Sequence, residues 1–374
     1  MLSSTATSVA VCYRSKLHEA TTGDKHDAVK SHADILIATL GSLGANSSYE
    51  EISPRDFRRS SMAKVDWVVL EYSPYSFARW GFAPYLLIRF RRRRARTYRL
   101  ALFVHEAFDS SGGQPPRKRI ITMWQRYQLR KLVGCADVIF VSNDGYRGVV
   151  EDLVPGCQAI HVPTFATVGT GGVAKQEARA RLGLADGALV VSMFGGGRPD
   201  RGLEHIGRAV QAIRQIDSKA ILLNLGEGAP LQITGLSNAD VRRPGALSEE
   251  ELSLWLASSD LFLAPFRDGA FSGRSTIAAA LSHGLPVLGT RGRMTDALLI
   301  EHPEALCLVD ADNVAGFALE ATLLVQDDER RVRLAEAGLA FYEAELSPDK
   351  AARTVALSLG IGIAEQTSRS LVHE

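Results

Sequence analysis

Short apolar runs alternate with amphipathic segments along the chain, a pattern typical of β–α units around a parallel sheet. The strands predicted in the first half are rich in Val, Ile, Leu and aromatic residues, and they cover residues 8–13, 65–72, 100–108, 137–142 and 159–163. Helical periodicity predicts helices around 26–43 and near 121–134.

The same alternation starts again after a glycine-rich stretch, "TVGTGG", at residues 167–172. The second set of predicted strands covers residues 189–197, 220–228, 260–266 and 285–290. The predicted helices of this half cover residues 202–216, 248–257 and 275–283, followed by amphipathic segments over 312–344 and about 348–366. Because glycine clusters mark breaks between elements, this stretch predicts a linker between two α/β domains.

The length of the chain agrees with two globular domains, since 374 residues exceed one domain of typical size. A net charge of +1 argues against general nucleic-acid binding. The four cysteines show no CxxC spacing and the nine histidines show no HExxH motif, so we expect no metal. The first residues lack the apolar core of a signal peptide, and no apolar run is long enough to span a bilayer. We therefore expect a cytoplasmic protein.

One local charge concentration stands out at Arg89–Arg99, where seven of eleven residues are arginine. Three interpretations stay open for this segment. It forms a solvated face, it binds nucleic acid, or it contacts an anionic membrane surface together with the adjoining "WGFAPYLLI". The third interpretation predicts a peripheral protein at the inner face of the membrane.

Three loops that follow predicted strands in the second half have residues suited to binding an anion. In parallel sheets, ligands gather beyond the carboxyl ends of the strands, where helices begin. In the first loop, "FGGGRPDRG", Gly196 and Gly197 allow close approach of the backbone to a ligand, and Arg198 and Arg201 supply fixed positive charge. The second loop, "GEGAP", begins with Gly226 and Glu227.

The third loop contains Asp268 and Gly269 and leads to a predicted helix at Arg274, Ser275 and Thr276. Ser272, Ser275 or Thr276 can cap this helix, and its free N–H groups and the nearby arginine attract negative charge. The three loops together predict a site for a diphosphate. Neither a P-loop nor a GxGxxG motif is present, which disfavours a phosphate-cleaving ATPase and a dinucleotide oxidoreductase.

These motifs resemble the donor domain of retaining GT-B glycosyltransferases of the family 4 type. The resemblance covers roughly residues 188–345 through "VVSMFGGGRPDRGLEHIGRAV", "LLNLGEGAP", "ALSEEELSLWLASSDLFLAPF" and "IAAALSHGLPVLGT". The first half resembles the acceptor domain more faintly, through "DWVVLEYSPYSFARWG" and "LFVHEAF". The resemblance implies an α/β fold, GT-B, with two Rossmann-like parallel-sheet domains facing each other across a cleft.

This fold implies three segments in the chain. Residues 1–166 form the acceptor-side domain and residues 173–345 form the nucleotide-sugar donor domain. Residues 346–374 form a C-terminal helix that crosses back to the first domain.

Carried over residue by residue, the resemblance assigns the donor diphosphate to Arg198 and Arg201, with Arg201 in place of the family's lysine. The family's histidine near the donor sugar corresponds to His105, and its acceptor-side loop falls on Gly23 and Lys25. The resemblance implies that the diphosphate is held without a metal or a cofactor.

One departure from the family concerns its paired glutamates, whose positions fall on Phe271 and Ala279. Asp268, Arg274 and Ser275 are the candidates to replace them. The predicted function is transfer of a sugar from a nucleotide-sugar to an acceptor hydroxyl with retention, in synthesis of a surface polysaccharide, a glycolipid or a glycosylated metabolite. The alternatives are a non-catalytic GT-B-like protein that binds a nucleotide or sugar, or a sugar-nucleotide epimerase or phosphorylase.

Overall fold

The computed structural model describes residues 6–13, 28–52, 64–78, 80–90, 97–108, 116–185, 187–194, 200–226, 233–237 and 241–362. The chain divides into two compact units. The first unit contains the described residues up to Ser142, the segment Tyr146–Val162 and the residues from Pro348 onward. The second contains Asn143–Gly145 and Pro163–Ser347. No helix within the described ranges is both long and apolar enough to cross a membrane.

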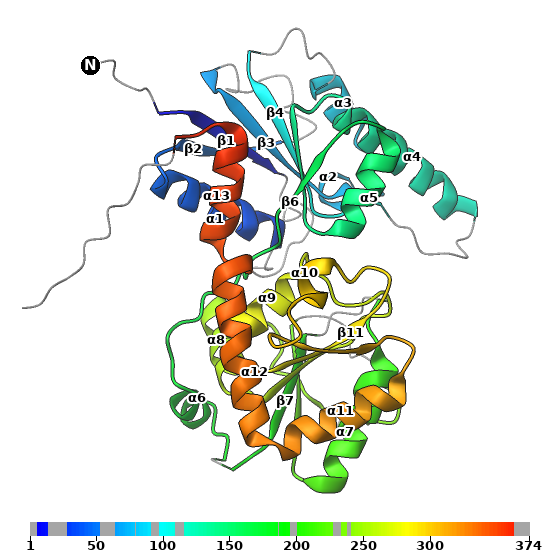
Figure 1. The fold of residues 1–374 in the computed structure, drawn as a ribbon, viewed down its shortest axis with the longest axis vertical. Coiled ribbons are helices and arrows are strands. Elements are labelled where there is room, and N and C mark those ends of the chain that lie inside the picture. Colours follow the sequence, from blue (N-terminus) through cyan, green and yellow to red (C-terminus); the bar gives the residue numbers. More distant parts are fainter. Residues whose placement is uncertain are drawn as a thin grey trace, which may run out of the picture. The chain divides into compact units, whose positions relative to one another are not determined.

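The first unit is built on a six-stranded sheet in the order β2-β1-β3-β4-β5-β6, with every strand pair parallel. Its strands are β1 (Ser8–Tyr13), β2 (Asn46–Glu51), β3 (Trp67–Tyr72), β4 (Arg99–Val104), β5 (Val138–Val141) and β6 (Ala159–His161). Its helices are α1 (Ala28–Ser42), α2 (Pro74–Phe77), α3 (Pro84–Phe90), α4 (Pro116–Val133), α5 (Asp144–Leu153) and α13 (Pro348–Leu359). The last helix packs against α1, so the end of the described chain belongs to the first unit (Figure 1).

The second unit contains another six-stranded parallel sheet, in the order β12-β11-β10-β7-β8-β9. Its strands are β7 (Val190–Phe194), β8 (Ile221–Leu225), β9 (Val241–Arg242), β10 (Leu261–Ala264), β11 (Val287–Arg291) and β12 (Cys307–Asp310). Its helices are α6 (Lys175–Arg181), α7 (Leu203–Ile216), α8 (Glu249–Ala257), α9 (Ser275–Ser282), α10 (Ala297–Ile300), α11 (Val314–Gln326), α12 (Asp328–Phe341) and the π-helical turn η5 (Tyr342–Leu346). The strand order reverses between β7 and β10, and ligands of open parallel sheets bind at such a point.

Apolar side chains cover both faces of the second sheet, as expected for a parallel sheet with helices on each side. Along β10, Leu261 and Leu263 belong to one core cluster, whereas Phe262 and Ala264 belong to the other. All four side chains are fully buried. The predicted α/β fold is confirmed, because each unit contains one Rossmann-like parallel sheet.

Candidate functional site

The point where the second sheet reverses its strand order brings the loop after β7 onto the end of β10. Arg201 forms an isolated antiparallel bridge with Phe266, and the backbone N–H of Gly202 donates to the carbonyl of Pro265 at 3.0 Å. The start of α7 is thereby fixed beside the carboxyl end of β10. The two loops that the sequence predicted as anion-binding therefore meet at the topological switch point of this sheet.

Two arginines converge here on one aromatic ring. The guanidinium of Arg201 lies 4.6 Å from the centre of the Phe266 ring, and that of Arg274 lies 4.1 Å from it. Arg274 also lies 4.4 Å from the Phe271 ring and forms an ion pair of 2.7 Å with Asp200. A guanidinium that lies over a ring can still donate hydrogen bonds in its own plane, a geometry that suits bidentate contacts with phosphate. We call Arg201 and Arg274 the arginine pair.

The ring that supports the arginine pair is itself held rigidly. The hydroxyl of Thr290, on β11, accepts a hydrogen bond from the Phe266 N–H at 2.8 Å and donates to the Phe266 carbonyl at 2.6 Å. Thr290 and Phe266 are both almost completely buried. A fixed aromatic platform reduces the conformational freedom that the arginine pair would lose on binding a ligand.

Helix α9 begins beside the arginine pair without a side-chain cap, with Arg274 as its N-cap residue. Ser272 does not cap the helix, because both its hydroxyl and its backbone N–H donate to Asp296. Ser275 and Thr276 lie in the first turn, and the Thr276 hydroxyl oxygen is buried and has no partner among the described residues. An uncapped helix N-terminus with two nearby arginines is suited to an anion.

Asp268 and Gly269 lie in the same loop but have other partners. The Asp268 carboxylate accepts a hydrogen bond from Arg293 at 2.9 Å, with both side chains largely exposed. Gly269 has φ +92°, and a Cβ atom there would come within 2.4 Å of the Gly292 backbone nitrogen. The glycine is therefore required for packing of the loop, which is a structural reason for its presence.

The remaining predicted donor residues are only partly described. Gly226 follows β8 with φ +112°, a conformation that favours glycine. The predicted residues that lie outside the described part of the chain are Gly23, Lys25, Gly196, Gly197, Arg198 and Glu227.

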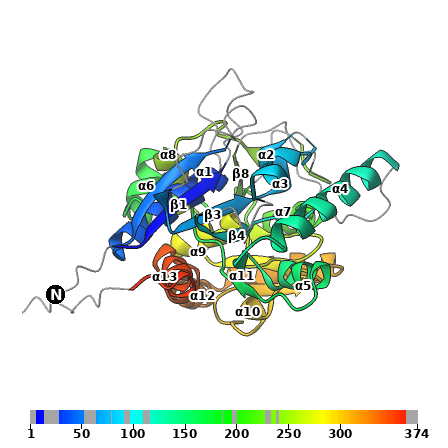
Figure 2. The same cartoon turned by 90° about the horizontal axis from the view of Figure 1, so that it is seen from above.

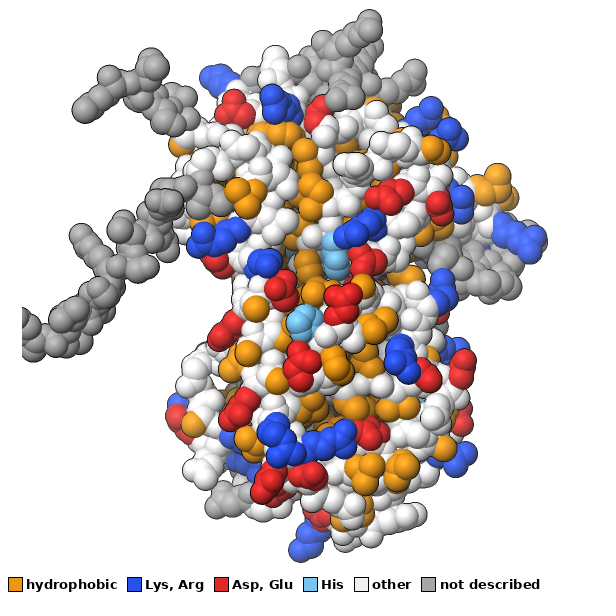
Figure 3. Space-filling model, in the orientation of Figure 1, with side chains coloured by type: hydrophobic (Ala, Val, Ile, Leu, Met, Phe, Trp, Pro, Cys, Tyr) orange, Lys and Arg blue, Asp and Glu red, His pale blue; other side chains and the backbone are white. Residues whose placement is uncertain are grey.

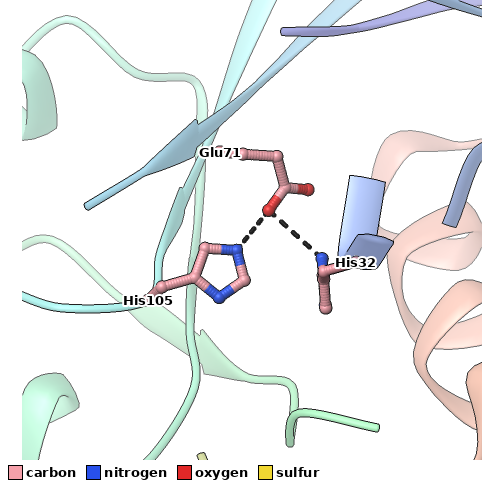
Figure 4. Close-up of side chains that lie close together, drawn as sticks. All are labelled: His32, Glu71 and His105. Carbon is pink, nitrogen blue, oxygen red and sulfur yellow. Dashed lines mark hydrogen bonds and ion pairs between the residues drawn. The ribbon is translucent and has the colours of Figure 1, made fainter. Parts of the chain in front are cut away.

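In the first unit, His105 follows β4 directly and lies in a buried cluster that the sequence did not reveal. Glu71 comes from β3 and His32 from α1, and the Glu71 Oε2 atom contacts both imidazole rings (Figure 4). Its distance to Nδ1 of His32 is 3.2 Å, and it is hydrogen-bonded to Nε2 of His105. The two rings meet edge to face at 4.6 Å, and the His105 ring stacks on Phe103 at 4.7 Å. We call His32, Glu71 and His105 the His–Glu–His cluster.

The pKa values of Glu71 and His32 indicate which groups of this cluster are charged. Burial alone would raise the pKa of Glu71, but the charges and hydrogen bonds of the two histidines lower it to about 2. Burial lowers the pKa of His32, which favours its neutral form. The fully buried carboxylate is therefore ionised at neutral pH. A buried charge is stable only when it is paired and hydrogen-bonded, so we infer that the cluster depends on its histidines.

The nitrogen and oxygen atoms of the His–Glu–His cluster that could bind a metal ion lie within 4.8 Å of one another. A zinc ion about 2.0–2.1 Å from each tetrahedral ligand keeps those ligands roughly 3.3 Å apart. The Glu71 oxygen lies 3.2 Å from Nδ1 of His32, close to that spacing, and is hydrogen-bonded directly to Nε2 of His105. In this structure one carboxylate oxygen of the cluster contacts both imidazoles.

Comparison with known proteins identifies the second unit. Residues 187–327 match the family model described as glycosyl transferases group 1. These residues form a glycosyl transferases group 1 domain. A search of curated proteins finds no match to the chain.

Solved structures show that its fold is GT-B. Sucrose-phosphate synthase from Thermosynechococcus elongatus is 14% identical, with a TM-score of 0.68 over 94% of this chain and 98% of that one. HepE of Anabaena, in complex with UDP and glucose, is 14% identical, with a TM-score of 0.67 over 95% and 99%. WaaG, involved in lipopolysaccharide biosynthesis, is 13% identical, with a TM-score of 0.63 over 93% and 99%.

Proposed function

We propose that the chain transfers a sugar from a nucleoside-diphosphate sugar to an acceptor hydroxyl, with retention of configuration and without a metal ion. The observation that carries this proposal is the stacking of Arg201 and Arg274 on the Phe266 ring beside the uncapped start of α9. The donor diphosphate binds at these groups, together with Arg198 and with the backbone of Gly196, Gly197 and Gly226. Ser275 and Thr276, in the first turn of α9, contact the same diphosphate.

The arginine pair acts on the leaving group in this mechanism. As the bond from the anomeric carbon to the diphosphate oxygen lengthens, negative charge grows on the diphosphate. Positioned donors stabilise that charge, and loss of one such donor typically slows a reaction by about 10²–10³-fold. The departing phosphate oxygen accepts the proton of the acceptor hydroxyl, so no side-chain nucleophile is needed.

His105 is proposed to contact the donor sugar through the ring nitrogen that points away from Glu71 (Figure 4). Its orientation is set by the hydrogen bond from Nε2 to Glu71 and by the stack on Phe103. A carboxylate that holds one imidazole nitrogen fixes which nitrogen faces the ligand.

In the family that the sequence resembles, the second glutamate is the usual partner of the donor ribose, and its position here is Ala279. Ala279 is buried in α9 and offers no polar side chain, and the ring at the first position, Phe271, lies under Arg274. We propose that Arg274 and Asp268 take part in the contacts that the glutamates make in the family.

The proposed acceptor belongs to a surface polysaccharide, a glycolipid or a glycosylated metabolite, and a lipid-linked acceptor would place the enzyme at the inner face of the membrane. Because HepE is seen with UDP and with UDP-glucose, uridine nucleotides are the first donors to test. The segment Arg89–Arg99 is the part of the chain that the sequence proposes for the membrane contact.

The test is thermal unfolding of the protein with UDP, GDP and ADP, each with and without a chelator. One nucleotide should raise the melting temperature whether or not chelator is present, and saturation at a hundred times its Kd adds about 2.7 kcal/mol to the unfolding free energy. The shift should vanish in Arg274→Ala and persist in Arg291→Ala, whose arginine forms an exposed ion pair with Asp310. Loss of the shift with chelator would contradict the metal-free proposal, and no shift with any nucleotide would favour a protein that has lost donor binding.

A further inference from the structure

Helix α4 carries an unusual surface on the first unit. The helix contains six basic residues and no acidic residue over eighteen positions. Its buried side is formed by Gln125, Gln128, Leu129, Leu132 and Val133. The opposite side faces solvent, and both views of the fold show the helix extending along the edge of the first unit (Figures 1 and 2).

The exposed side of α4 is apolar along its centre. Ile120, Met123 and Tyr127 have the spacing of one helical face, and 68%, 69% and 48% of their surfaces are exposed. Arg119, Arg126 and Arg130 fall along one border of this strip at helical spacing, and Lys131 falls on the other. Figure 3 shows apolar and basic side chains next to each other at the edge of the molecule where α4 lies.

Two exposed aromatic residues extend this apolar strip. Trp80 and Phe82 are 55% and 57% exposed, and the Phe82 ring lies 4.4 Å from that of Trp124 on α4. The buried glutamines of α4 hold this loop in place. Gln125 Nε2 donates to the Trp80 carbonyl at 3.2 Å, and Gln128 Oε1 accepts from the backbone N–H that follows Phe82 at 3.0 Å.

We propose that this surface, formed by Trp80, Phe82, Ile120, Met123 and Tyr127 with the basic residues of α4, docks on an anionic lipid membrane. A helix face with large apolar side chains bordered by Lys and Arg is suited to the boundary between head groups and acyl chains. The long basic side chains reach the lipid phosphates while the apolar ones enter the membrane. An exposed apolar patch rimmed by polar groups marks an interaction site.

The positive charge of the α4 surface favours an anionic membrane over a second copy of the chain as its partner. A symmetric contact between two copies would place the same cationic helix face against itself. Residues 91–96 of the arginine-rich segment lie outside the described part of the chain, and both ends of the segment have partners within the first unit. Arg89 is largely buried and pairs with Glu50 at 3.6 Å, and Arg99 lies over the Trp67 ring at 5.4 Å. These two arginines are engaged within the unit, whereas Arg119, Arg126 and Arg130 on α4 are exposed.

The test is flotation of the full chain with vesicles of phosphatidylcholine alone or of phosphatidylcholine mixed with phosphatidylglycerol, without nucleotide or sugar. The wild type should bind the anionic vesicles at least tenfold more tightly, and binding should weaken with salt. A triple variant, Ile120→Ser, Met123→Ser and Tyr127→Ser, should lose at least tenfold in affinity, which is about 1.4 kcal/mol.

The matched control replaces three exposed apolar residues of the second unit, Leu319→Ser, Leu323→Ser and Val332→Ser, and it should bind as the wild type does. Equal binding to neutral vesicles, no binding at all, or full binding by the α4 triple variant would overturn the proposal. Self-association that the triple variant abolishes, without vesicle binding, would assign the surface to a second copy instead. Because the assay uses no donor, its failure is separate from failure of the proposed transfer reaction.

Discussion

Replacement of Glu71 by Gln tests the His–Glu–His cluster, because it keeps the shape of the side chain and removes its charge. The carboxylate is fully buried, and one oxygen contacts both His32 and His105. In the variant, the two imidazoles lose the anion between them. The neutral amide weakens the hydrogen bonds that the carboxylate makes to the two rings, and a hydrogen bond to a charged group typically contributes about 1.5–3 kcal/mol to stability.

The lowered pKa of Glu71 gives a second value for the contribution of its charge to stability. It is lowered from 4.5 to about 2, and at 1.36 kcal/mol per unit the ionised form contributes about 3 kcal/mol to the stability of the wild type. Since the folded value lies below the unfolded one, this contribution is complete above about pH 4.5 and is lost as pH falls toward the folded value. Linkage predicts a loss of about 1 kcal/mol at pH 4 and about 2 kcal/mol at pH 3.

Urea unfolding followed by tryptophan fluorescence measures this effect. Three of the four tryptophans, Trp67, Trp80 and Trp124, lie in the first unit, so the signal reports mainly on it. The stability difference between the wild type and Glu71→Gln should be largest near pH 7 and should shrink by about 2 kcal/mol at pH 3. The control Glu106→Gln changes a partly exposed carboxylate that accepts a hydrogen bond from Ser73 and leaves the His–Glu–His cluster intact, so its stability difference from the wild type should change less with pH. A difference that stays constant from pH 7 to pH 3 would refute the charged cluster.

Two other predictions concern the loops of the second unit. Gly269→Ala should lower stability by about 2 kcal/mol more than Gly284→Ala, as measured by urea unfolding, because both have positive φ but only the first meets the Gly292 backbone. Equal losses would show that the clash is relieved. Thr290→Val leaves the buried N–H and carbonyl of Phe266 without their side-chain partner and should cost about 1–3 kcal/mol. If Thr290→Ser were as unstable as Thr290→Val, the role of the hydroxyl would be contradicted.

Most of the fold could be predicted from sequence because buried parallel strands have continuous apolar runs. The strand over Ser8–Tyr13 and the helix that starts at Ser275 begin where the pattern predicts. Strand β2 was missed because its sequence, Asn46–Glu51, is polar. It lies at the edge of the first sheet, where one side of the strand has no neighbour and an apolar run is not needed.

The candidate site was only partly visible in the sequence. Glycines and arginines after strands indicated Arg201 and Arg274, but their shared platform, Phe266, looked like the end of an apolar strand. Their contact joins positions more than sixty residues apart, which no local pattern reveals. Glu71 looked like one polar residue in a buried strand, and its pairing with His32 and His105 depends on how α1, β3 and β4 pack. Serines such as Ser272 were predicted as caps from residue type alone, whereas the structure gives this one Asp296 as its partner.

The central claim is that the arginine pair binds a diphosphate, and calorimetric titration with UDP and with uridine tests it directly. The wild type should bind UDP far more tightly than uridine, because charge-assisted hydrogen bonds to phosphate contribute about 1.5–3 kcal/mol each. In Arg274→Ala this preference should fall at least tenfold, because the variant loses more affinity for UDP than for uridine, the signature of coupling between the arginine and the phosphates. An unchanged preference for UDP over uridine in Arg274→Ala would contradict the account.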